Sequence, residues 1–169
     1  MSRMMHSICV FTLSAAGAFA QTATTSPVVT YTTGMTGVAD GQTARLNVLN
    51  PGVQPPAIGP VCSAVISFLD SGGNVLKTTT VSVAPGTAAA PFDITAADLS
   101  IAAGTREEIR ATITIPAIVP VSTSGASTSP TPSCKLIGTV EIFDSVTRRT
   151  ESQLGGFHEV PSAPVSTSN

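Results

Sequence analysis

The sequence is poor in the residues from which nucleic-acid sites and many active sites are built. Its 169 residues include no tryptophan and only two histidines, and 11% of them are charged, against about 25% in a typical domain. The formal net charge is −2, so no basic surplus is available to neutralise a phosphate backbone. The sequence also lacks a phosphate-binding loop, a Gly-x-Ser-x-Gly elbow and a zinc-protease motif. We therefore expect no nucleic-acid partner.

Histidine and cysteine are too sparse for a metal or catalytic centre. After the first twenty residues, His158, Cys62 and Cys134 are the only residues of these two types. A zinc site needs about four closely spaced ligands, and a catalytic thiol needs a histidine beside it. Acids stand at three turns, where side-chain bonding to the backbone is their ordinary role: Asp40, Asp70 and Asp144. We expect a protein that is not an enzyme, with no catalytic residue, cofactor or metal.

The N-terminus has the pattern of an export signal. Arg3 is followed by the apolar run "SICVFTLSAAGAFA", which ends in Ala-Phe-Ala before Gln21. The run is shorter than the roughly 20 apolar residues that span a membrane. We expect a secreted or periplasmic protein with no membrane insertion after signal removal. Four segments are expected: a signal peptide at 1–20, a flexible leader at 21–27, a β-sandwich domain at 28–155 with a Ser/Thr/Pro-rich loop at 117–133, and a disordered tail at 156–169.

The central part of the chain alternates between apolar and polar residues with the period of a β-strand. The alternation is clear in Thr43 to Leu49, in "CSAVISFLD" from Cys62 to Asp70, and in Glu108 to Ile115. The segment "DSGGN" is typical of a hairpin turn, and "APGT" is typical of a type II turn. About seven short strands and no convincing helix predict an all-β protein, an antiparallel β-sandwich.

The two cysteines of the mature chain open two similar strands. Cys62 lies on the apolar face of "CSAVISFLD", and Cys134 lies on the apolar face of "CKLIGTVEIFD". Two inward-facing cysteines in an exported chain predict one intramolecular disulfide. The bridge would close 73 residues, counting both ends, which stabilises the fold by about 4 kcal/mol in the chain-entropy model.

The turns and alternation resemble those of bacterial extracellular immunoglobulin-like modules of the cell-adhesion-related type. "GQTARLNVLNPG" resembles their second strand, and "ISFLDSGGNVLKTTTVSVAPGTAAAPFDI" resembles the next hairpin, turn and strand. The chain is also similar to small secreted bacterial proteins of unassigned function. The resemblance implies an immunoglobulin-like β-sandwich, although the buried tryptophan of antibody domains is missing. Two placements of the disulfide are open: between the third and last strands of one sheet, which we favour, or across the core from the second strand.

This resemblance implies a protein that works through its surface. We expect a non-enzymatic module for adhesion, envelope structure or partner binding, with a protein or glycan surface as its partner. The alternative is a fimbria-like subunit or assembly partner that uses strand addition at an exposed edge. Arg148 and Arg149, at a hairpin, are the candidate surface contacts.

Overall fold

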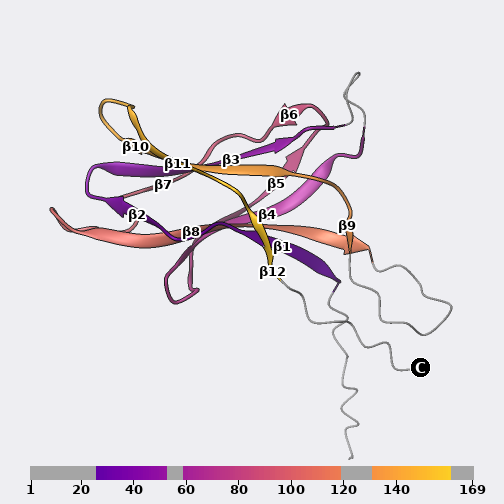
Figure 1. The fold of residues 1–169 in the computed structure, drawn as a ribbon, viewed down its shortest axis with the longest axis horizontal. Coiled ribbons are helices and arrows are strands. Elements are labelled where there is room, and N and C mark those ends of the chain that lie inside the picture. Colours follow the sequence, from indigo (N-terminus) through magenta and orange to yellow (C-terminus); the bar gives the residue numbers. More distant parts are fainter. Residues whose placement is uncertain (1–25, 53–58, 119–130, 161–169) are drawn as a thin grey trace, which may run out of the picture.

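Two antiparallel β-sheets packed face to face form the fold (Figure 1). The computed structural model describes residues 26–52, 59–118 and 131–160, and within these residues no helix forms. The predictions of an all-β sandwich and one disulfide are confirmed. The described residues form twelve strands instead of the seven or so expected, because in each sheet a long strand pairs on one side with two short segments.

The larger sheet has seven strands. Its main order is β12-β1-β8-β4-β5, and both β2 and β9 also pair with β8. The long strand β8 holds this sheet together, since it pairs with β1 and β2 on one side and with β4 on the other. The bounds are β1 Val28–Thr32, β2 Thr36–Ala39, β4 Cys62–Asp70, β5 Val75–Val83, β8 Arg106–Ile118, β9 Thr131–Pro132 and β12 His158–Val160.

The smaller sheet has five strands. Its order is β11-β10-β3-β6, and β7 pairs with β3 beside β6. The bounds are β3 Gln42–Asn50, β6 Thr87–Ala88, β7 Phe92–Thr95, β10 Ile137–Asp144 and β11 Thr150–Gly155. Strand β3 takes the alternating segment predicted from the sequence, and its buried apolar residues Ala44, Leu46 and Val48 face the larger sheet.

The core lies between the sheets and is built from the apolar half of each alternating strand. Phe68 of β4 is fully buried, and its ring stacks on Phe92 of β7 with centroids 5.4 Å apart, so the contact joins the two sheets. Leu46, Ile66 and Ile113 are also inaccessible or nearly so. Burial of one such side chain contributes about 1.5–3 kcal/mol to the free energy of unfolding. The alternation of apolar and polar residues, which places these side chains between the sheets, is therefore the main source of the fold's stability.

The disulfide joins the two sheets. Cys62 opens β4 in the larger sheet, and Cys134 lies three residues before β10 in the smaller sheet, with the Cα atoms 5.8 Å apart. Our favoured placement, in which both cysteines open strands of one sheet, is therefore wrong. Strand β4 pairs with β8 and β5 in the larger sheet, whereas β10 pairs with β3 and β11 in the smaller one, so the two strands do not flank a common neighbour.

The hairpin "DSGGN" stays within one sheet and joins β4 to β5. Asp70 accepts hydrogen bonds from the backbone N–H and the side-chain amide of Asn74, each at 2.8 Å. Gly73 has φ of +87°, which a side chain would strain. The turn chemistry predicted from the sequence is therefore present, and it fixes the register of a nine-residue edge strand.

The boundaries of the domain differ from the prediction at the C-terminal end. His158–Val160, placed in a disordered tail, forms β12 and pairs with β1. Part of the predicted Ser/Thr/Pro loop is also strand, because Ala117 and Ile118 belong to β8 and Thr131–Pro132 is β9. The signal peptide, most of the leader, residues 119–130 of the loop and residues 161–169 of the tail lie outside the described residues.

Candidate functional site

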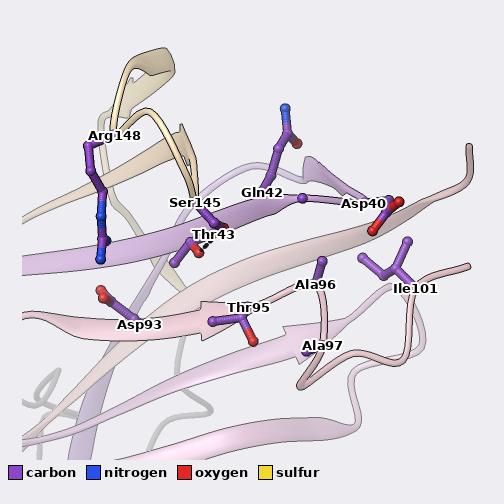
Figure 2. Close-up of a pocket in the computed structure, with 11 residues that line it drawn as sticks. Asp40, Gln42, Thr43, Asp93, Thr95, Ala96, Ala97, Ile101, Ser145 and Arg148 are labelled. Carbon is purple, nitrogen blue, oxygen red and sulfur yellow. Dashed lines mark hydrogen bonds between the residues drawn. The ribbon is translucent and has the colours of Figure 1, made fainter. Parts of the chain in front are cut away.

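A hollow of about 620 Å³ lies at one end of the sandwich (Figure 2). Three segments surround it: the β2–β3 turn, the end of β7 with the turns that follow, and the β10–β11 turn. Its polar lining includes Asp40, Gln42, Thr43, Asp93 and Ser145. Figure 2 shows Arg148 and Asp93 approaching one another at the side of the hollow.

Most of these polar side chains bond to the protein itself. Thr43 Oγ1 and Ser145 Oγ are 2.7 Å apart, and Gln42 Oε1 accepts a hydrogen bond from the Ala39 N–H at 2.7 Å. Both carboxylate oxygens of Asp93 accept hydrogen bonds from the Arg45 guanidinium at 2.8 Å. This hydrogen bond is the main reason why the pKa of Arg45 is raised above its ordinary value. These contacts tie the turns to the sheet and leave no paired nucleophile and base among the side chains named.

The two predicted surface arginines have different environments. The Arg148 guanidinium lies over the ring of Phe143, 5.5 Å from its centroid, and Arg45 covers the same ring at 4.8 Å. Phe143 is 3% exposed although it lies outside the main core cluster. Arg149 is exposed in the turn and does not line the hollow. Both arginines are exposed, and only Arg148 lines the hollow and packs on Phe143. Their role as a surface contact stays a prediction.

Two of the three turn acids, Asp70 and Asp144, bond within their own turns. Asp144 Oδ1 accepts hydrogen bonds from the N–H groups of Val146 and Thr147 and from the Thr147 hydroxyl. The Thr147 backbone N–H is the main cause of the lowered pKa of Asp144, and the Asn74 side chain is the main cause for Asp70. Within the described ranges, no three His, Cys, Asp or Glu side chains gather to hold a metal ion.

The outer face of the larger sheet carries rows of hydroxyl groups, which we call the hydroxyl face. Neighbouring strands align these side chains across the sheet in register. One row runs His158, Thr32, Thr112, Ser67 and Thr78; a second runs Val160, Thr30, Thr114, Val65 and Thr80; Ser63 and Ser82 pair in a third. These rows contain no Asp, Glu, Lys or Arg.

Hydrogen bonds link the hydroxyls within a row. Thr30 Oγ1 and Thr114 Oγ1 are 3.0 Å apart, and Ser67 Oγ and Thr78 Oγ1 are 2.8 Å apart. Neighbouring strands are about 4.8 Å apart, and alternate residues of one strand are about 6.8 Å apart. The rows therefore form an uncharged array of hydroxyls that both donate and accept hydrogen bonds, interrupted by Val65 and Val160 and with Ser67 only 7% exposed.

Sequence reasoning identified the polar positions of these strands but not the hydroxyl face. Their order across the sheet is β1, β8, β4 and β5, so the rows combine residues from distant parts of the chain. The signal available in the sequence was a threonine at every second position of three strands, in the segments "TYT", "TIT" and "TTT". His158, expected near a frayed tail, stands in a row through β12.

No protein-family model matches this chain, and comparisons with curated proteins and with solved structures find no match either. Among the described residues, no helix is long and apolar enough to cross a membrane.

Proposed function

We propose that this protein is an exported, non-enzymatic binding module for adhesion, envelope structure or partner binding, and that its hydroxyl face attaches to a glycan surface. The rows of hydroxyls across β12, β1, β8, β4 and β5 carry this proposal. Glycans present closely spaced hydroxyls, and a grid of serine and threonine can donate to and accept from them. No charged side chain in these rows has to be desolvated when a partner covers them.

Two further features support the setting and type of the module. The Cys62–Cys134 disulfide is typical of oxidising compartments, which supports a secreted or periplasmic location. The two-sheet antiparallel architecture is compatible with the immunoglobulin-like sandwich of the cell-adhesion-related type that is part of this proposal. In this proposal the opposite face of the sandwich, with its Arg45–Asp93 ion pair at 2.8 Å, does not carry the glycan contact.

The test is binding of the mature chain to a panel of insoluble glycans and to bacterial envelope preparations. A quadruple variant, T78V/T80V/T112V/T114V, removes hydroxyls while keeping the branched shape that suits a strand. Thr139→Val, on the outer face of β10, is the matched control. We expect the quadruple variant to lose binding and the control to retain it. Equal binding by all three proteins, or no binding by the wild type, would refute the proposal.

A second candidate function is strand addition at the edge of the larger sheet, as in a fimbria-like subunit or assembly partner. The observation that favours it is the nine-residue strand β5, which pairs with β4 alone among the described residues. Thr80→Pro would remove an N–H on the outer side of this edge, and Thr80→Val would keep it. We expect Thr80→Pro alone to abolish co-assembly with envelope components in sedimentation. Unchanged co-assembly of Thr80→Pro would exclude this candidate.

A further inference from the structure

The free edge of β5 has an identifiable set of outward backbone groups. The Thr33 N–H donates a hydrogen bond to the Ala111 carbonyl. The backbone N–H and C=O groups of odd-numbered residues of β8 therefore point toward β1, and those of even-numbered residues point toward β4. Because of the β8–β4 and β4–β5 registers, the backbone N–H and C=O groups of the odd-numbered residues of β5, from Lys77 to Val83, point toward β4. The N–H and C=O groups of Thr78, Thr80 and Ser82 therefore point away from the sheet.

This edge lacks the devices that usually protect an edge strand. Proteins block such edges with proline, with outward charges, with bulges or with very short strands. β5 has nine residues and no proline, and its register shift against β4 is confined to the hairpin end, between Phe68 and Leu69. Its one charged residue, Lys77, is held by Asp98 with Nζ and Oδ2 3.3 Å apart. The remaining side chains are uncharged.

The strand sequence is complementary to itself in the antiparallel sense. When "VLKTTTVSV" pairs with a second copy about Thr79, Thr78 faces Thr80 of the other copy, and Lys77 faces Val81. Threonine pairs across antiparallel strands are favourable, and no like charges meet. Thr78 and Thr80 then form narrow hydrogen-bonded pairs, and the two Thr79 residues form a non-hydrogen-bonded pair at the two-fold axis. The hydroxyl rows of both copies join into one continuous sheet face.

We propose that β5 pairs antiparallel with β5 of a second copy of this chain, with the two-fold axis at Thr79. The inference rests on the second candidate function and names its partner. A single strand pair buries less area than a standard interface, so the dimer is a weak and concentration-dependent one. Pairing leaves the hydroxyl face open and doubles its width, which raises the avidity for an extended surface.

The experiment uses charge at the two-fold position. Thr79→Lys and Thr79→Glu each place like charges opposite one another, and each should weaken self-association about fivefold or more in sedimentation velocity. An equimolar mixture of the two variants should restore it, because lysine then faces glutamate. Val146→Lys, in the exposed β10–β11 turn, is the control for added charge and should associate like the wild type.

A crosslink reports the register independently. Thr79→Cys in the mature chain should form a disulfide-linked dimer under mild oxidation, since the two Cα atoms would be about 4.5 Å apart. Thr78→Cys, whose residue would face Thr80 of the other copy, should crosslink much less. A wild type that stays monomeric at several hundred micromolar, with no crosslink at Thr79→Cys, would overturn the inference. Loss of envelope co-assembly in Thr80→Pro would then still support strand addition with another partner.

Discussion

Removal of the disulfide should lower the stability of the domain by a large share of its total. In a C62A/C134A variant of the mature chain, the unfolded state loses a crosslink between residues 72 apart in sequence. The chain-entropy model assigns such a loop about 4 kcal/mol. That loss is a large share of a typical stability of about 5–15 kcal/mol. For a domain of this size it corresponds to a drop of about 15 °C in melting temperature.

The measurement is urea unfolding followed by circular dichroism, with thermal melts alongside. The control is a V61A/S133A variant, which changes the exposed neighbours of the two cysteines and keeps the bridge. A thiol titration of the denatured wild type should find no free thiol before reduction and two after it. Two thiols before reduction, or a loss below about 1 kcal/mol in C62A/C134A, would refute the reasoning.

Three further perturbations test the packing and the turns. Phe68→Ala should cost about 3–5 kcal/mol in urea unfolding, because the side chain is fully buried against Phe92; a loss below about 1 kcal/mol would contradict the stacked core. Arg148→Ala should cost about 0.5–1 kcal/mol by uncovering the Phe143 ring, whereas Arg149→Ala should be neutral, and equal effects would remove the packing role of Arg148. The folded-state pKa of Asp70 lies below the ordinary 3.8, so its contribution is complete above that pH and is lost as pH falls through the lowered pKa. The stability gap between wild type and Asp70→Asn should therefore shrink on acidification; a gap that is constant or widens would contradict the turn hydrogen bonds.

Local features of the sequence predicted much of the fold. The alternation in β3, β4 and β8, and the turn at Asp70, depend on residues close together in the chain, and these elements formed as predicted. That the two cysteines form a disulfide was also predictable, since they are an inward-facing pair in a chain with a predicted export signal. Which strands the bridge joins was not predictable, because it depends on the sheet order. The point at which the C-terminal tail leaves the fold was not predictable, because β12 forms only by pairing with β1, which is distant in the chain.

The candidate site was less accessible to sequence reasoning. The two arginines of the β10–β11 hairpin stood out by charge, but the packing of Arg148 depends on Phe143, which nothing in the local pattern distinguishes. The hydroxyl face is assembled from strands that are adjacent in the sheet and distant in the chain. Threonine in strands is ordinary in sequence, and only register turns it into rows.

The sequence by itself determined the class of structure, because apolar and polar residues that alternate with period two can bury one face only as strands. It also determined the chemistry available at the surface, rich in hydroxyls and poor in charge. Tertiary structure alone decided which strands are neighbours, and so placed the disulfide between the two sheets and left β5 at an edge. The physical reason is that backbone hydrogen bonds between strands are the same for every pair, so the choice of partner is made by packing across the whole core.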